Sequence, residues 1–255
     1  MRIIDVRERP IEISRHRDPR IPSGGLTTSL VAVVTDVIRG GRPVVGYGFA
    51  SIGRYAQSGL IGERFVPRLL RAPAQDITTD DGVNLDPFRA WTVMMTGEKP
   101  GGHGERCVAV GTLDKALWDA AAKIADLPLH QFLADRLGRN VTAADVPVYA
   151  SGGYPYPGGD IAALTEEVRR FTDLGFTRVK IKIGATSLDQ DLRRIEAAAA
   201  RLGDSQHLAF HPFHGPPAAL LVSAGRVRLP DVPGIGFELH EDAWQAFRSL
   251  APPLD

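Results

Sequence analysis

The run VKIKIG at residues 179–184 constrains the fold of this chain most, because apolar and basic side chains alternate along it. Such alternation predicts a short β-strand, and side chains two residues apart on a strand share one face. Lys180 and Lys182 therefore project together. They belong either to an edge strand with a solvated face or to a strand that lines a site. In a site, each cation depresses the pKa of the other, so one lysine can be neutral near pH 7 and act as a base.

The first 140 residues predict an α+β module. The strongest strand is the β-branched run TTSLVAVVTDVI at 27–38, flanked by strands at 2–13 and 43–50 and joined to the second of these by the turn RGGR. Asp86 is the predicted N-cap of a helix in which Pro87 is the first residue. The predicted helices are 58–72, 84–96, 108–124 and 129–137. Together these segments predict a three-stranded antiparallel sheet followed by helices.

After residue 140 the pattern changes to alternating strands and helices. Strands are predicted at 146–150, 176–183 and 206–210, and helices at 160–174 and 188–202. This order is typical of a parallel α/β structure. The Pro-rich segment HPFHGPP then interrupts it, and a hairpin around Ala224 and Gly225 and a helix at 241–250 follow.

Composition excludes several classes of function. The 30 basic and 30 acidic residues leave no net field, so neither nucleic acid nor an anionic membrane is an expected partner. No run approaches the roughly 20 apolar residues of a membrane span, and the charged N-terminus lacks the apolar core of a signal peptide. The single cysteine, Cys107, is interpreted as a small buried hydrophobe. We expect a cytoplasmic protein.

Several motifs, in order, resemble the enolase superfamily, in its mandelate racemase/muconate lactonizing branch. The most similar pattern is that of D(−)-tartrate dehydratase-like acid-sugar dehydratases. The motifs are TTSLVAVVTDV at 27–37, GRYAQSGLIGERF at 53–65, EKPGGHGER at 98–106, GGYPYPG at 152–158, KIKIG at 180–184 and LPDVPGIGFE at 229–238. The resemblance implies an N-terminal capping domain at 1–140 and a (β/α) TIM-like barrel that is only partial, with a C-terminal tail, at 141–255.

The resemblance also implies a chemistry and its residues. Lys182 would be the base that removes the proton alpha to a carboxylate, and Lys180 its electrostatic neighbour. Lys99 would face the substrate from the cap, and Tyr154 would lie near the mouth of the barrel. The implied reaction is Mg²⁺-dependent loss of water from a hydroxy-dicarboxylate or acid sugar, with tartrate as the nearest example.

One departure from the family pattern concerns the metal. The third predicted barrel strand should end in Asp-x-Asn, whereas residues 208–212 read LAFHP, and no later strands with Glu ligands follow. A (β/α)₈ barrel needs about 250 residues, and about 115 remain after the cap. We therefore expect an internally truncated barrel without metal ligands and impaired or absent turnover. We also expect either poor solubility or self-association that covers the exposed edges.

Other residues have competing interpretations. His207, His211 and His214 could form a replacement metal site, or they could be ordinary loop residues. Asp114 and Asp119 are expected to be exposed or helix-terminal charges, and Trp91 and Trp118 to be core residues. Two further functions stay open: a non-catalytic pseudoenzyme that acts by association with itself or a relative, and a small-molecule module in which Lys180 and Lys182 clamp an anion.

Overall fold

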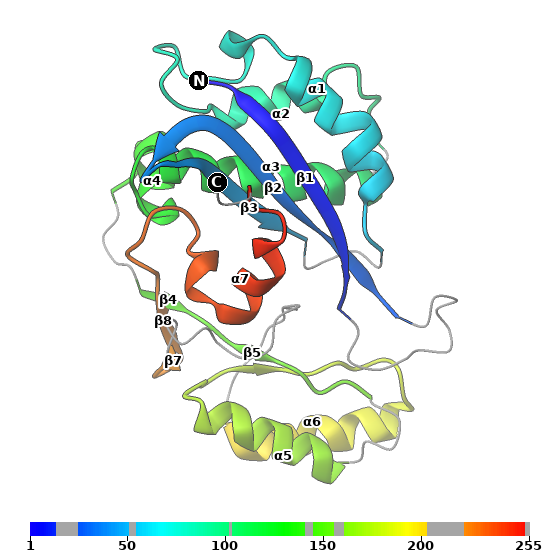
Figure 1. Cartoon of the computed structure of the whole chain (residues 1–255). Helices are drawn as coiled ribbons and strands as arrows, with labels where there is room; N and C mark the ends of the chain where they lie inside the picture. The colour runs from blue at the N-terminus through cyan, green and yellow to red at the C-terminus, as the bar shows by residue number, and fades with distance from the viewer. Residues whose placement is uncertain are drawn as a thin grey trace. The chain divides into compact units, whose positions relative to one another are not determined.

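The computed structural model describes residues 1–13, 25–50, 55–101, 104–140, 145–155, 161–202 and 222–252. They form two compact units (Figure 1). The first holds the described residues of Met1–Val141 and Pro230–Asp255, and the second holds those of Thr142–His211 and Gly215–Leu229. The chain therefore leaves the first unit after its helices and returns to it after residue 229.

A three-stranded antiparallel sheet organises the first unit. Its strands follow in the order β1 (Ile3–Glu12), β2 (Thr27–Arg39) and β3 (Arg42–Phe49). Gly40 and Gly41 join β2 to β3 with φ values of 55° and 78°, which are the left-handed values that a tight hairpin turn requires. The predicted sheet and its turn are confirmed.

Helices follow the sheet in the first unit. They are the π-helical turn η1 (Leu60–Phe65), α1 (Val66–Arg71), the 3₁₀ turn η2 (Ala74–Asp76), α2 (Pro87–Met95), α3 (Glu105–Ile124), α4 (Leu129–Arg136), the 3₁₀ turn η3 (Phe237–Leu239) and α7 (Glu241–Arg248). The carboxylate of Asp86 accepts hydrogen bonds from the backbone N–H groups of Phe88 and Arg89, at 3.0 and 3.2 Å. The predicted N-cap is therefore confirmed.

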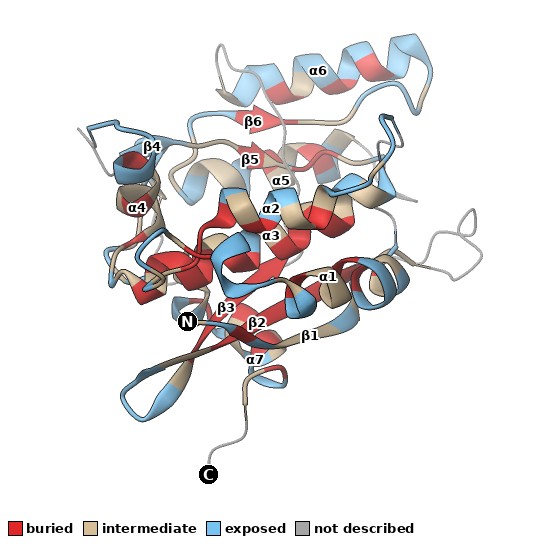
Figure 2. Ribbon diagram, turned by 90° about the horizontal axis from the view of Figure 1, so that it is seen from above, coloured by how far each residue is buried: buried red, intermediate tan, exposed pale blue. Residues whose placement is uncertain are grey.

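Strand β2 is buried on both of its faces (Figure 2). Val31 and Val33 pack in the cluster that includes α3, whereas Leu30 and Ala32 pack in the cluster that includes α7. Because successive side chains of a strand point to opposite faces, a strand covered on both sides needs apolar residues at nearly every position. This explains the continuous apolar run of β2.

Asp119 corrects one expectation from the sequence, because it is completely buried rather than exposed. Its Oδ2 accepts a hydrogen bond from the N–H of Tyr47 at 2.8 Å, and its Oδ1 accepts one from the N–H of Ile235 at 2.6 Å. The carboxylate therefore joins α3 both to β3 and to the segment that returns after residue 229. Asp114, one turn earlier, is half-buried.

Trp91 and Cys107 also lie elsewhere than expected. Trp91 is 48% exposed, because α2 packs into the core through Ala90 and Met94 and turns Trp91 outward. Cys107 is exposed in the first turn of α3. Trp118 packs against the core, as expected.

The second unit contains two small sheets and two helices. The strands β4 (Asp145–Pro147), β8 (Arg226–Arg228) and β7 (Val222–Ser223) form an antiparallel sheet, and β5 (Ala150–Ser151) pairs in parallel with β6 (Val179–Lys180). The helices are α5 (Ile161–Asp173) and α6 (Leu188–Leu202). The predicted hairpin is confirmed, since Ala224 and Gly225 have φ values of 48° and 71° between β7 and β8.

The parallel strands are shorter than the sequence predicts. The registered pairing ends at Ser151 and Lys180. Two residues after Ser151, Gly153 has a φ of 63°, which is not a strand conformation. The predicted strand at 206–210, together with His207, His211 and His214, lies outside the described residues. None of the described helices has both the length and the apolar character needed to cross a membrane.

Candidate active site

The ends of β5 and β6 place two polar residues side by side. Ser151 pairs with Lys180 in the parallel register, next to the pair of Ala150 and Val179. Ala150 and Val179 face the core that α5 and α6 complete. Because strand residues alternate between faces, Ser151 and Lys180 lie on the face away from that core.

Lys180 is buried, with only 6% of its surface exposed. Its Nζ has no hydrogen-bond partner among the described residues, and neither has the Ser151 hydroxyl. Burial lowers the pKa of Lys180, and the positive charge of Lys182 lowers it further. A lysine in this environment loses its proton more readily than an exposed lysine does, and its ammonium form is suited to bind an anion.

Lys182 and Tyr154 meet beside this pair. The Nζ of Lys182 lies 5.5 Å from the centre of the Tyr154 ring, within the range of a cation–π interaction. Two backbone hydrogen bonds align their segments. The N–H of Gly152 donates to the carbonyl of Lys180 at 2.9 Å, and the N–H of Lys182 donates to the carbonyl of Gly153 at 3.1 Å. Lys180, Lys182 and Tyr154 therefore share one site in the second unit.

Two carboxylates near these strand ends are engaged with the backbone. Glu167 accepts a hydrogen bond from the N–H of Gly153 at 2.8 Å. Asp191 accepts one from the Thr186 hydroxyl at 2.6 Å and another from the N–H of Gly184 at 2.7 Å. These bonds, with that of Thr186 foremost, lower the pKa of Asp191. Both carboxylates therefore brace loops that flank the lysines.

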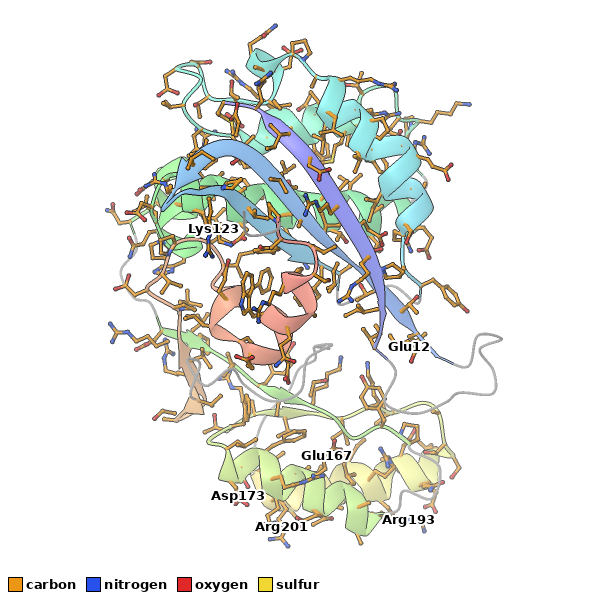
Figure 3. The ribbon with its side chains drawn as sticks, viewed as in Figure 1. Glu12, Lys123, Glu167, Asp173, Arg193 and Arg201 are labelled. Carbon is orange, nitrogen blue, oxygen red and sulfur yellow. The ribbon has the colours of Figure 1, made fainter. Side chains whose placement is uncertain are left out.

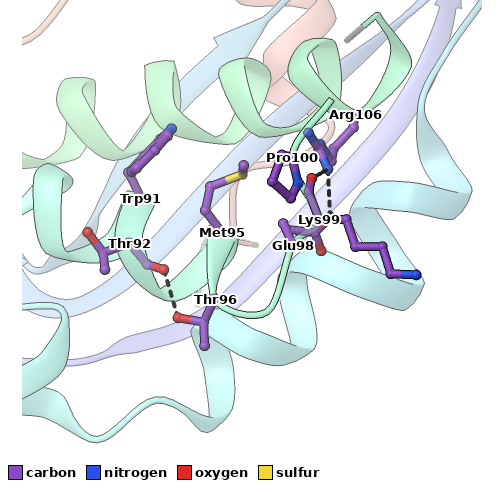
Figure 4. A pocket seen from close by; sticks show the side chains of 8 residues that line it. All are labelled: Trp91, Thr92, Met95, Thr96, Glu98, Lys99, Pro100 and Arg106. Atoms are coloured by element: carbon purple, nitrogen blue, oxygen red, sulfur yellow. Dashed lines mark hydrogen bonds and ion pairs between the residues drawn. The ribbon is translucent and has the colours of Figure 1, made fainter. Parts of the chain in front are cut away.

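Lys99, the fourth predicted site residue, belongs to the first unit. It lines a cavity of about 400 Å³ at the end of α2, which Figure 4 shows from close by. The lining residues are Trp91, Thr92, Met95, Thr96, Glu98, Lys99, Pro100 and Arg106. Arg106 donates to the backbone carbonyl of Lys99 at 2.8 Å and also pairs with Glu98 at 3.2 Å.

The sequence motifs do not include Ser151, Glu167 or Arg194. Arg194 is 4% exposed, and its Nη2 donates to the carbonyl of Gly153 at 2.6 Å. The available signal was the spacing of polar residues on α6, where Asp191 and Arg194 lie on the same face as buried Ala198. A pattern analysis that searches for apolar stripes does not select such a face.

Known proteins with similar sequences include acid-sugar dehydratases. The arabinonate dehydratase of Saccharolobus solfataricus is 29% identical over 109 residues, which is 43% of this chain and 28% of that enzyme. The L-talarate/galactarate dehydratase of Salmonella typhimurium is 26% identical over 175 residues, which is 68% of this chain and 40% of that enzyme. The chain thus spans less than half of the length of these relatives. No family model matches it.

Solved structures extend the similarity to most of the chain. A mandelate racemase/muconate lactonizing enzyme-like protein from Rubrobacter xylanophilus has a TM-score of 0.54 and 26% identity, over 80% of this chain and 50% of its own. A racemase from Streptomyces coelicolor with bound magnesium has a TM-score of 0.57 and 25% identity, over 80% of this chain and 53% of its own. The mixed α/β fold is therefore shared over 80% of the chain.

The Streptomyces coelicolor racemase has bound magnesium. The described residues of this chain do not form a site that fits this ion. Among those residues, no group of three or more His, Cys, Asp or Glu side chains gathers at one point. The oxygens of Glu167 and Asp191 accept hydrogen bonds from the protein itself. A hard divalent cation needs several oxygen ligands together, and the part of the chain that the structure describes does not supply them.

The sequence relatives include dehydratases of sugar acids, and the structural neighbours include a mandelate racemase/muconate lactonizing enzyme-like protein and a racemase. In sequence and in fold, this chain therefore resembles the mandelate racemase/muconate lactonizing branch of the enolase superfamily.

Proposed function

We propose that this chain carries the lysine-bearing part of an acid-sugar dehydratase site. Its substrate class is a hydroxy-dicarboxylate similar to tartrate, and Lys182 is the base. The observation that carries the proposal is the meeting of Lys180, Lys182 and Tyr154 at the ends of two parallel strands. Supporting it are the dehydratase relatives, each of which this chain covers only in part.

The two lysines suit an anionic substrate that must lose a proton. One ammonium group pairs with the substrate carboxylate, and a neutral amine accepts the proton of the adjacent carbon. The electron pair of the broken C–H bond then forms the C=C bond as the β-hydroxyl leaves. That hydroxyl takes up the proton that Lys182 removed and departs as water, which leaves Lys182 neutral again, and the enol product rearranges to a 2-oxo acid. Proton removal is the step that this chain's own residues can perform.

Turnover by this chain is expected to be slow or absent. In a magnesium-dependent enzyme the ion stabilises the charge that develops when the proton leaves. The described side chains offer no carboxylate cluster for such an ion. The function proposed here is therefore carboxylate binding with proton exchange, and complete dehydration is impaired.

The proposal includes an organisation of the chain. Residues 1–140 act as the capping domain, with Lys99 facing the substrate, and residues 141–255 form the partial barrel and its tail. The location is cytoplasmic, and the assembly is a homo-oligomer. These assignments rest on the sequence motifs and on the resemblance.

A variant tests the assignment of Lys99. If Lys99 faces the substrate, Lys99→Met should weaken binding of a dicarboxylate more than binding of a monocarboxylate.

Exchange of the α-proton in D₂O tests the chemical proposal. The protein is incubated with D-tartrate, and loss of the α-proton signal is followed by NMR. We expect slow exchange that Lys182→Met abolishes together with binding. Lys182→Arg should keep binding, because it keeps the charge, yet lose exchange, because arginine stays protonated. Exchange that survives both substitutions would show that Lys182 is not the base.

A second candidate function is association without catalysis. Leu188, Leu192 and Ile195 follow one face of α6 and are 76%, 49% and 40% exposed. An exposed stripe of this kind favours contact with another protein surface, and a second copy of the chain is the simplest one. Light scattering should detect self-association that Leu188→Gln with Leu192→Gln reduces and that Leu137→Gln, at a residue 57% exposed in the first unit, does not. A monomer at all concentrations would exclude this function.

A further inference from the structure

We propose that Glu167 and Arg194 are positioning residues. They hold the peptide of Gly153 from both sides and thereby keep the Tyr154 ring against the Lys182 side chain. The inference rests on the proposed role of Lys182, and it adds two residues to which neither the sequence motifs nor the resemblance assigns a role.

The backbone of Gly153 is held at both of its polar groups. Its N–H donates to Oε2 of Glu167, from α5, at 2.8 Å. Its carbonyl accepts from Nη2 of Arg194, from α6, at 2.6 Å, and from the N–H of Lys182 at 3.1 Å. Two helices and the segment just after β6 therefore converge on one residue, which directly precedes Tyr154.

This residue has to be glycine, and its conformation needs support. Its φ is 63°, and a Cβ atom at this position would lie 2.6 Å from the side chain of Ile181. Glycine loses more conformational freedom on folding than any other residue. A flexible turn next to Tyr154 would allow the ring to leave Lys182, and the two charged contacts oppose that movement.

The burial of Arg194 indicates that its role is specific. The residue is 4% exposed, and its Nε has no hydrogen-bond partner among the described residues. Among the described residues it pairs with Asp191, at 4.0 Å from Nε to Oδ1. Burying a guanidinium group is costly unless it is paired and hydrogen-bonded. A shorter apolar residue would suit a helix whose only task was packing, so the retained charge points to the carbonyl that it binds.

Asp191 extends the same brace to the other side of the lysines. It holds the N–H of Gly184 and the hydroxyl of Thr186, just after the lysine strand. The face of α6 that carries Asp191 and Arg194 thus contacts the loop after β5 and the loop after β6. Both segments that bear Lys182 and Tyr154 are fixed by one helix.

The chain offers a matched control beside each positioning residue. Arg193 has a side chain 59% exposed and pairs with Asp189 at 3.0 Å. Glu166 has a side chain 53% exposed and pairs with Arg169 at 2.7 Å. Figure 3 shows Glu167 on α5 and Arg193 on α6. Each pair differs by one position in the sequence and by whether the side chain reaches Gly153.

NMR of the protein with ¹³C at the ε-carbon of lysine tests the inference without substrate. The chain has five lysines, and Lys182→Arg identifies the signal of interest. The Tyr154 ring should shift the ε-protons of Lys182 upfield, and Tyr154→Leu should abolish this ring-current shift. Arg194→Met and Glu167→Ala should each remove most of it. Arg193→Met and Glu166→Ala should leave it unchanged.

Conservative variants separate positioning from loss of folding. The amide oxygen of Glu167→Gln can still accept the N–H of Gly153, so this variant should retain the shift. Circular dichroism should show that the compared variants are folded. If Arg194→Met and Glu167→Ala are both folded and keep the full ring-current shift, the inference is wrong. It is equally wrong if the control variants lose the shift to the same extent.

The readout also separates this inference from the proposed function. The ring-current shift depends only on the geometry of Tyr154 and Lys182. A shift that responds as expected, with no α-proton exchange in the natural protein, would support the brace and reject the role of Lys182 as a base. The opposite result is α-proton exchange that Lys182→Arg abolishes, together with a ring-current shift that Arg194→Met and Glu167→Ala leave unchanged. It would support Lys182 as the base and reject the positioning role of Arg194 and Glu167.

Discussion

Lys123 lies at the centre of a buried charged network in the first unit. Its Nζ pairs with Asp119 at 2.7 Å, binds the carbonyl of Val45 at 3.1 Å and also pairs with Glu238. Burial raises the pKa of Asp119, and the charge of Lys123 opposes that increase. Removing one partner of such a pair leaves the other charge buried without compensation.

We therefore expect Lys123→Met to lower the free energy of unfolding by about 3–5 kcal/mol. Urea denaturation provides the measurement. The control is Arg2→Met, which removes the pair with Asp36 at 3.4 Å, where the Arg2 side chain is 75% exposed. That loss should stay below about 1 kcal/mol. Equal losses in the two variants would contradict the importance of the buried pair.

Asp114 gives a prediction about pH. Burial raises the pKa of this carboxyl from 3.8 to about 6. A raised pKa means that the folded state keeps the proton more tightly than the unfolded state does, so stability is lost as the pH rises from 4 through 6. Asp114→Asn removes this loss. The free energy of unfolding of the variant, relative to that of the natural protein, should therefore increase between pH 4 and pH 7 by up to about 3 kcal/mol. If the difference between the two proteins stays constant over this pH range, the charge of Asp114 is not buried.

At the scale of elements, the contact between β3 and α3 depends on glycine. A Cβ atom on Gly46 would lie 2.0 Å from the carbonyl oxygen of Ala116, and one on Gly48 would lie 2.4 Å from that of Thr112. The helix therefore packs directly on the backbone of the strand. This close approach brings Asp119 within reach of the N–H of Tyr47.

Gly46→Ala should destabilise the protein by about 3 kcal/mol or more, because neither backbone can move without breaking the packed layer. Gly62→Ala is the matched control, since no atom lies within 4 Å of the added Cβ. In the helical turn η1 that change should be neutral or stabilise by up to about 1 kcal/mol. A Gly46→Ala protein as stable as the control variant would show that α3 can move away from β3.

Helix α6 shows how an element can be predicted while its orientation is not. The sequence predicted a helix at 188–202, and the structure has one over the same residues. The apolar stripe of Leu188 and Leu192 is exposed, whereas Asp191 and Arg194 are buried. Amphipathic periodicity alone would place the leucines inward. The hydrogen bonds of Asp191 and Arg194 to the loops around the lysines favour the opposite face.

At the scale of the whole molecule, the segment after residue 229 completes the first unit. Phe247 of α7 is fully buried, with ring centres 5.1 Å from Tyr47 and 5.1 Å from Phe237. Phe247 and Phe237 pack in the cluster that covers the face of β2 opposite α3. The sheet thus depends on residues that are about 200 positions away in the sequence.

Phe247→Ala should lower the free energy of unfolding by about 3–5 kcal/mol, because it removes a buried ring and leaves a cavity. Phe88→Ala, at a residue 51% exposed on α2, should cost clearly less. Thermal unfolding of the two variants provides the comparison. A small effect of Phe247→Ala would mean that α7 contributes little to the stability of the sheet.

The sequence by itself determined the local features. The β-branched run of β2, the glycine pair of the hairpin and the Asp86 N-cap all follow from the preferences of neighbouring residues. The two-residue period also predicted a strand through Lys180 and Lys182, of which the structure has the part that ends at Lys180. Such features depend on interactions between residues a few positions apart, which a pattern records directly.

Only the tertiary structure decided which charges are buried and what they hold. Asp119 binds backbone groups of β3 and of the returning segment, and Arg194 binds the turn that precedes Tyr154. These partners lie 41 to 116 positions away along the chain. A local pattern contains no information about such a partner, because the free energy of burying a charge depends on groups that folding brings to it.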